Sequence, residues 1–129
     1  MNQKKSNRTN PAWRTRQTVL LFLVWLPPFV FSLATILALK IPVYASWFLW
    51  LNLWAVLIFA LDKRFAVRGT QRIPERVLFL VLATGGVLGG MLGMVWFHHK
   101  TNKMTFTMVL ILSALLHGWI ILKLIQSKF

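Results

Sequence analysis

The stretch VLFLVLATGGVLGGMLGMVWF, residues 77–97, decides how this chain folds. It has no charged residue, and it contains five glycines: Gly85, Gly86, Gly89, Gly90 and Gly93. At about 100° per residue, these glycines fall within an arc of roughly 140° on a helix. A smooth face of this kind lets another backbone approach closely, and close packing is a main force that joins helices in lipid. The pattern predicts a helix-packing seam, either within the bundle or with a second copy or another membrane protein.

Three more uncharged runs, at 18–39, 43–61 and 105–122, flank this stretch. Each is long enough for a helix to cross a hydrocarbon core about 30 Å thick, which takes roughly 17–25 residues. Hydrophobic residues make up 57% of the chain and charged residues only 13%, which excludes an ordinary soluble domain. We therefore predict an all-α integral membrane bundle of four transmembrane helices, at about 18–39, 43–61, 77–97 and 105–125. They form one domain, 18–129, after a basic cytoplasmic tail at 1–17.

The glycines leave one alternative open, because five of them within nine residues allow a bend. The segment 77–97 would then be a re-entrant hairpin that enters and leaves the membrane on one side. The straight span is the preferred interpretation, since re-entrant backbone must be buried in protein and this chain is small.

The net charge of +13 sets the orientation. Cytoplasmic loops of membrane proteins collect Lys and Arg. With the N-terminus inside, 12 of the 15 Lys and Arg residues lie on the cytoplasmic side, whether 77–97 spans or turns back. We expect a multi-pass protein of the bacterial inner membrane with a cytoplasmic N-terminus. Its partners are the bilayer and its anionic headgroups, and nucleic acid is not an expected partner.

Two polar side chains, Asn52 and His117, lie inside predicted spans. Polar groups within a membrane usually face the bundle interior. An interhelical hydrogen bond is therefore the expected role of Asn52, and His117 is expected to be a packed, hydrogen-bonded side chain. His117 has no neighbouring ligand residues, and the chain has no cysteine. No metal or cofactor is expected.

The two carboxylates of the chain, Asp62 and Glu75, lie at the two ends of one basic loop. Glu75 suits the first turn of a helix, where the helix dipole favours a negative charge. The first interpretation is that the two acids anchor the ends of this loop. The loop also contains the dipeptide Asp62-Lys63 and the tetrapeptide RIPE, residues 72–75.

A second interpretation makes these residues a site together with the basic segment HHKTNK, residues 98–103. The side chains that would hold a phosphate are Lys63, Arg72, Lys100 and Lys103, and those that would do acid–base work are Asp62, Glu75 and His99. The two clusters must meet for this purpose, and a straight helix over 77–97 would keep them on opposite faces of the membrane.

The motifs have a recognisable order. It runs Asn52, Asp62-Lys63, Ala66, Arg72-Ile73-Pro74-Glu75, Leu78, Gly85-Gly86, Gly89, Gly93-Met94, Phe97, His99-Lys100-Thr101, Lys103 and Phe106. Over about residues 50–125 the chain resembles a small bacterial membrane family known as domain of unknown function 1294. The resemblance implies a membrane-embedded helical core and no established activity. His98 stands where the family often has arginine.

These observations favour an interaction or accessory protein with basic loops that face lipid headgroups, and they lean against an enzyme. The alternative is a membrane-interface enzyme or carrier for a phosphorylated lipid or a small anion.

Overall fold

The computed structural model describes residues 11–69, 73–98 and 103–129. Over these residues the chain forms, in order, α2 (Pro11–Leu39), α3 (Val43–Val67), α4 (Glu75–Ala83), α5 (Val87–Trp96) and α6 (Met104–Lys128). Three stretches are long and apolar enough to cross a membrane, Thr18–Leu39, Val43–Val67 and Met104–Lys128. The predicted all-α class is therefore confirmed, and three of the four predicted spans correspond to long apolar helices.

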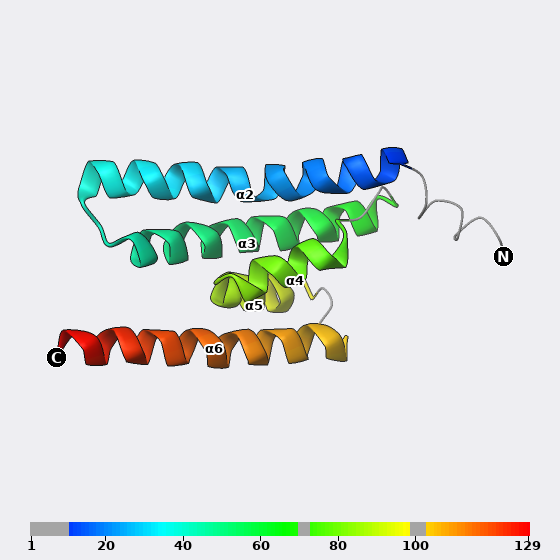
Figure 1. Cartoon of the computed structure of the whole chain (residues 1–129). Coiled ribbons are helices and arrows are strands. Elements are labelled where there is room, and N and C mark those ends of the chain that lie inside the picture. Colours follow the sequence, from blue (N-terminus) through cyan, green and yellow to red (C-terminus); the bar gives the residue numbers. More distant parts are fainter. Residues whose placement is uncertain (1–10, 70–72, 99–102) are drawn as a thin grey trace.

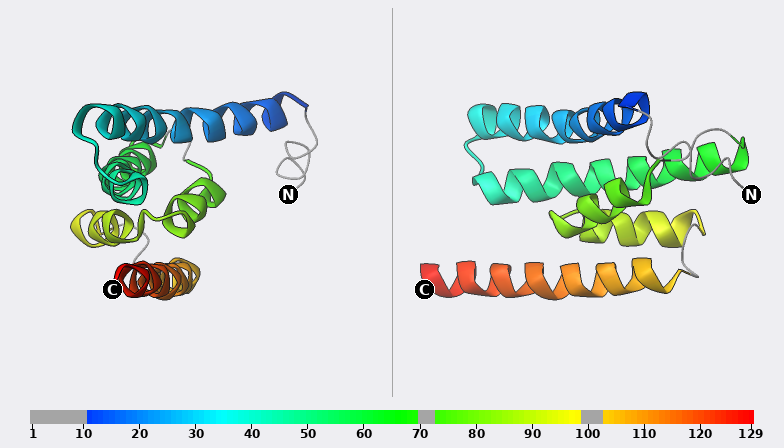
Figure 2. Two further views of the ribbon diagram at one scale, coloured as in Figure 1. Left: turned by 60° about the vertical axis from the view of Figure 1, so that its left-hand side comes forward. Right: turned by 45° about the vertical axis from the view of Figure 1, so that its right-hand side comes forward.

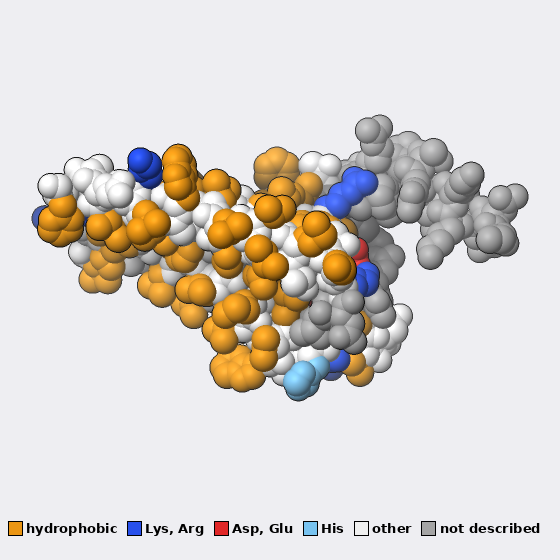
Figure 3. All heavy atoms as spheres, turned by 90° about the horizontal axis from the view of Figure 1, so that it is seen from below, with side chains coloured by type: hydrophobic (Ala, Val, Ile, Leu, Met, Phe, Trp, Pro, Cys, Tyr) orange, Lys and Arg blue, Asp and Glu red, His pale blue; other side chains and the backbone are white. Residues whose placement is uncertain are grey.

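The helices are stacked so that α3 lies between α2 and the pair α4–α5, while α6 lies on the far side of that pair (Figure 1). In Figure 2, α5 turns back toward the end at which α4 began, so the two short helices form a hairpin. α3 packs against both α2 and α5, and α6 packs against α4 and α5. On the face that α6 presents, hydrophobic side chains are widely spread, and the charged side chains in view lie toward the two ends (Figure 3).

The hairpin corrects the prediction of one straight helix over 77–97. The helix is broken at Thr84, Gly85 and Gly86. The Gly86 N–H donates to the Val81 carbonyl at 2.9 Å, and the Gly85 N–H donates to the Leu82 carbonyl at 3.4 Å. This pair of hydrogen bonds is the Schellman motif, which ends many helices at a residue with positive φ. Here that residue is Gly85, with φ +131°. Helices of 9 and 10 residues are each about 15 Å long, roughly half of what a membrane span requires.

A single side chain of α3, Asn52, bonds to both sides of the break. Its Nδ2 donates to the Gly85 carbonyl at 3.0 Å and to the Phe48 carbonyl at 2.6 Å, while its Oδ1 accepts from the Gly89 N–H at 2.8 Å. Gly89 is the third residue of α5, and an N–H at that position has no partner within its own helix. A side-chain oxygen of the N-cap residue usually accepts from it. The residue at the N-cap is Gly86, which has no side chain, and Asn52 supplies the oxygen instead.

The glycines of α5 allow this close approach to α3. A Cβ on Gly89 would lie 1.9 Å from the backbone oxygen of Asn52, and one on Gly93 would lie 2.7 Å from the Cβ of Phe59. A Cβ on Gly90 would lie 2.1 Å from a methyl group of Leu82, on the other arm of the hairpin. The glycine face is thus occupied within the chain, and a partner that used it would have to displace α3.

The core that fixes the hairpin lies where α3, α4 and α6 converge. Phe106, in the first turn of α6, is fully buried. Its ring centroid lies 4.5 Å from that of Phe79 on α4 and 6.3 Å from that of Phe59 on α3. This aromatic cluster holds the start of α6 against the start of the hairpin, and it determines which polar residues meet at that end of the molecule.

Candidate functional site

The candidate site is the end of the molecule at which α3 finishes, α4 begins and α6 begins. α3 continues through Asp62 to Val67, so Asp62 lies inside the helix, more than one turn before its last residue. The predicted span 43–61 is therefore extended by a polar turn that contains Lys63 and Arg64. Glu75 is the first residue of α4. Lys103 is the residue that precedes α6.

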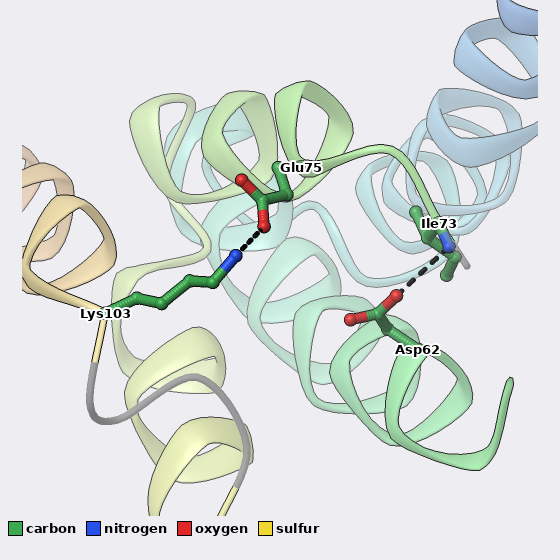
Figure 4. A network of polar contacts seen from close by, with 4 residues as sticks. All are labelled: Asp62, Ile73, Glu75 and Lys103. Atoms are coloured by element: carbon green, nitrogen blue, oxygen red, sulfur yellow. Dashed lines mark hydrogen bonds and ion pairs between the residues drawn. The ribbon is translucent and has the colours of Figure 1, made fainter. Parts of the chain in front are cut away.

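The Asp62 side chain is fully buried, and it holds the loop that leads into α4. Its Oδ1 accepts a hydrogen bond from the backbone N–H of Ile73 at 3.0 Å (Figure 4). Hydrogen bonds to a charged group are worth about 1.5–3 kcal/mol, more than those between neutral groups. Since Ile73 is followed by Pro74, which fixes its own φ near −57°, this bond positions the entry into the helix. The carboxylate thus connects the end of α3 to the RIPE tetrapeptide.

Glu75 forms an ion pair with Lys103 (Figure 4). Both side chains are about half exposed, 44% for Glu75 and 54% for Lys103. The stabilisation by an exposed ion pair is small, about 0–1 kcal/mol. Its importance lies in its position, because it joins the RIPE tetrapeptide to the last residue of the HHKTNK segment.

The two polar clusters that the sequence separates by a 21-residue apolar stretch therefore meet at one end of the molecule. The straight helix predicted over 77–97 would have placed them at opposite ends. Arg72, His99 and Lys100 lie outside the described residues. Lys63 lies in the last turns of α3 and is partly exposed.

Four cations of the described loop end are exposed or partly exposed: Lys63, Arg64, Arg68 and Arg76. With Lys103 they make five cationic side chains around two carboxylates, and both carboxylates are engaged. An anionic ligand would therefore meet an excess of positive charge. Asp62 is buried and accepts from Ile73 through Oδ1, and Glu75 is paired with Lys103, so both carboxylates already have a structural role in the loop.

The other predicted polar residue, His117, lies in α6, away from this end. Its Nδ1 is 2.7 Å from the Ser113 carbonyl one turn earlier, and its ring centroid is 5.7 Å from that of Phe48 on α3. Within the described residues, His, Asp and Glu form no group of three that could hold a metal ion.

The contacts that sequence reasoning missed are mainly backbone contacts. The Ile73 N–H and the Gly85 carbonyl carry no side-chain signal. Trp47 Nε1 donates to the Thr84 carbonyl at 3.3 Å, next to the break. The five glycines allowed a bend, and the adjacent pair Gly85-Gly86 together with the polar Asn52 in a neighbouring span is the combination that marks its place.

The fold and this polar end define a small all-α protein with three candidate membrane spans and a helical hairpin between the second and third. Comparison with known sequences places it more narrowly. The chain belongs to the family described as "Protein of unknown function (DUF1294)", which matches residues 52–106. That segment begins at Asn52 and ends at Phe106, so it contains the loop end and the whole hairpin.

The chain is also similar to "Uncharacterized protein YsdA" of Bacillus subtilis (strain 168). The two are 33% identical over 78 residues, which cover 57% of this chain and 88% of that protein. No solved structure matches the chain.

Proposed function

We propose that this protein is a multi-pass protein of the bacterial inner membrane whose loop end binds the phosphate groups of anionic lipids without chemical turnover. The N-terminus and the loop end face the cytoplasm, and the hairpin enters the bilayer from that side. α2, α3 and α6 cross it. The protein acts as an accessory or interaction protein anchored to anionic headgroups.

The observation that carries this proposal is the Glu75–Lys103 ion pair. It joins two basic segments into one surface at the end of the hairpin. A Lys or Arg near an anionic membrane surface contributes about 1 kcal/mol to binding, so several on one surface add up to a useful affinity. Lys and Arg are also the residues that cytoplasmic loops collect, which supports the orientation.

The same proximity of the two clusters supports the enzyme or carrier alternative. The bonded state of the two carboxylates, Asp62 and Glu75, disfavours it. A general acid or base needs a proton within reach of the substrate. Asp62 is fully buried and bonded to the Ile73 N–H, and Glu75 is paired with Lys103. Both acids therefore serve the loop, in line with the anchor interpretation.

The test uses the purified full chain in lipid nanodiscs of phosphatidylglycerol or phosphatidylcholine. We expect phosphatidylglycerol to raise the midpoint of thermal unfolding relative to phosphatidylcholine, and the difference to shrink as salt is added. Replacing Lys63, Arg64, Arg68 and Arg76 together by Gln should remove most of this difference. The control replaces Lys40 and Lys123, two cations that lie away from the loop end, by Gln and should keep the difference. An equal loss of the lipid effect per charge removed in the two variants would overturn the headgroup site, and release of phosphate from the lipid would favour the enzyme.

A further inference from the structure

A cavity of about 530 Å³ lies beyond the tip of the hairpin, at the other end of the molecule from the basic loops. Its walls are the first two turns of α3 and the second half of α6, and its floor includes Thr84 at the hairpin break. Its lining includes Tyr44, Phe48, Thr84, His117, Ile121 and Leu124.

The cavity exists because the hairpin ends before it reaches the start of α3 and the end of α6. α4 and α5 meet at Thr84, Gly85 and Gly86, whereas α6 continues to Lys128 and α3 begins at Val43. Ser113 is the last buried residue of α6. Beyond it, no element of the described chain fills the space between α6 and the beginning of α3, and the cavity remains.

The Thr84 hydroxyl and carbonyl and one ring nitrogen of His117 are already bonded within the protein. The Thr84 hydroxyl donates to the Leu80 carbonyl at 2.7 Å, and the Thr84 carbonyl accepts from Trp47. His117 Nδ1 is bonded to the Ser113 carbonyl. The remaining lining is mainly aliphatic and aromatic, so the cavity suits an apolar ligand.

The mouth of the cavity is cationic. Lys128, the last residue of α6, places its Nζ 5.9 Å from the centroid of the Tyr44 ring, which itself lines the cavity. A cation in such a place is also stabilised by the C-terminal end of the α6 dipole. A ligand with an apolar body and an anionic head matches both the wall and the mouth.

The charge at the mouth selects among apolar occupants. From His117 to Leu124 the wall of α6 is about 10 Å deep, and an unbranched hydrocarbon chain can lie along it while its phosphate head meets Lys128. A helix from a second copy, side by side in the same orientation, would bring no acidic side chain to that lysine, since both acidic residues of the chain, Asp62 and Glu75, lie at the loop end.

We propose that this cavity binds one acyl chain of an anionic phospholipid, whose phosphate lies against Lys128 and Tyr44. This lipid belongs to the leaflet opposite the loop end. The site shares no residue with the headgroup surface of the proposed function, so an experiment can refute one of the two proposals and leave the other intact.

The test is photolabelling of the purified full chain by phosphatidylglycerol with a diazirine on one acyl chain. We expect labelled peptides from residues 117–124 and 44–49. Ile121→Trp and Leu124→Trp fill the cavity, and each should lower this labelling at least about fivefold. The matched control is Leu115→Trp, because Leu115 is an exposed residue of the same helix that does not line the cavity; it should leave labelling unchanged.

The headgroup contact is tested by Lys128→Gln. It should lower labelling by the phosphatidylglycerol probe about fivefold, the factor that corresponds to the ~1 kcal/mol of one surface lysine. Labelling by the matching phosphatidylcholine probe should change little. The variant with four Gln at the loop end should label as the wild type does. Labelling that is even along α6, or equal loss in Ile121→Trp and Leu115→Trp, would show ordinary bilayer contact and overturn the proposal.

Discussion

The Asn52 side chain accepts a hydrogen bond from the backbone N–H of Gly89 at 2.8 Å, across the interface of α3 and α5. The same side chain donates to the Gly85 carbonyl on the other side of the break. Asparagine suits this place because its amide both donates and accepts without carrying a charge. One residue thereby satisfies the two backbone groups that the interruption of the helix exposes.

We predict that Asn52→Ala lowers the free energy of unfolding by about 1–3 kcal/mol, because Gly89 N–H and Gly85 C=O lose their partner in a buried place. Asn52→Asp should be at least as harmful, since a carboxylate keeps the acceptor but cannot donate to Gly85. Titration of the detergent-solubilised protein with a denaturing detergent measures both. Ser127→Ala, which removes an exposed hydroxyl bonded within its own helix, is the control and should be close to neutral. A neutral Asn52→Ala would contradict the role of this side chain.

Glycines give the second prediction, because the chain has a matched pair of positions. Gly89→Ala would place a methyl group 1.9 Å from the Asn52 backbone oxygen, so α5 must move away from α3. We expect a loss of at least ~2 kcal/mol, in the range of other overpacked cores. Gly118 lies within α6 with nothing within 4 Å of the place of a Cβ. Gly118→Ala should therefore raise stability by roughly 0.5–1 kcal/mol through helix propensity. Equal effects of the two substitutions would refute the seam.

The sequence could predict the three long helices because uninterrupted apolar runs of span length have few other solutions in a membrane. It could not choose the shape of 77–97 on the same grounds. That stretch is also long enough to span, and a hairpin would place the same apolar residues in the membrane as a straight helix would. The distribution of Lys and Arg could not distinguish the hairpin from the straight helix, since both arrangements place the same number of cations on the cytoplasmic side.

The choice depends on long-range contacts. Asn52 and Gly85 are 33 residues apart, and Glu75 and Lys103 are 28 residues apart. No local sequence pattern predicts contacts between residues so far apart in the chain. The two acids were recognisable as loop anchors from their places at the ends of a basic loop, but the partner of Asp62 is a backbone N–H, which every residue except proline carries. The pairing of Glu75 with Lys103 required the hairpin to be known first.

The bond from Ile73 to Asp62 gives the third prediction. Asp62→Asn keeps the shape of the side chain but replaces a charged acceptor by a neutral one, which weakens the bond by about 1 kcal/mol. Hydrogen exchange of the Ile73 amide should speed up about fivefold or more. Glu75→Gln is the control, because it alters the neighbouring acid without touching this bond. Unchanged exchange at Ile73 in Asp62→Asn would show that the carboxylate does not hold the loop.

The fourth prediction concerns the proximity of Glu75 and Lys103. Because an exposed ion pair adds little stability, Glu75→Cys with Lys103→Cys should still fold. The chain has no native cysteine, so a short bismaleimide can report this pair alone. We expect rapid cross-linking, seen as a mobility shift after cleavage of the chain between the two positions. The control pair, Glu75→Cys with Phe129→Cys, places one cysteine at the start of α4 and the other beyond the far end of α6, and it should not react. Similar rates for the two pairs would contradict the contact.

The central claim is that 75–96 turns back and brings the starts of α4 and α6 to one side of the membrane. Single cysteines at Val67, Met104 and Phe129, all exposed, test it with an impermeant maleimide in intact and permeabilised cells. We predict that Val67→Cys and Met104→Cys react only after permeabilisation, while Phe129→Cys reacts in intact cells. Labelling of Val67→Cys and Met104→Cys from opposite sides would show that the segment spans the membrane, and it would contradict this structure of the hairpin.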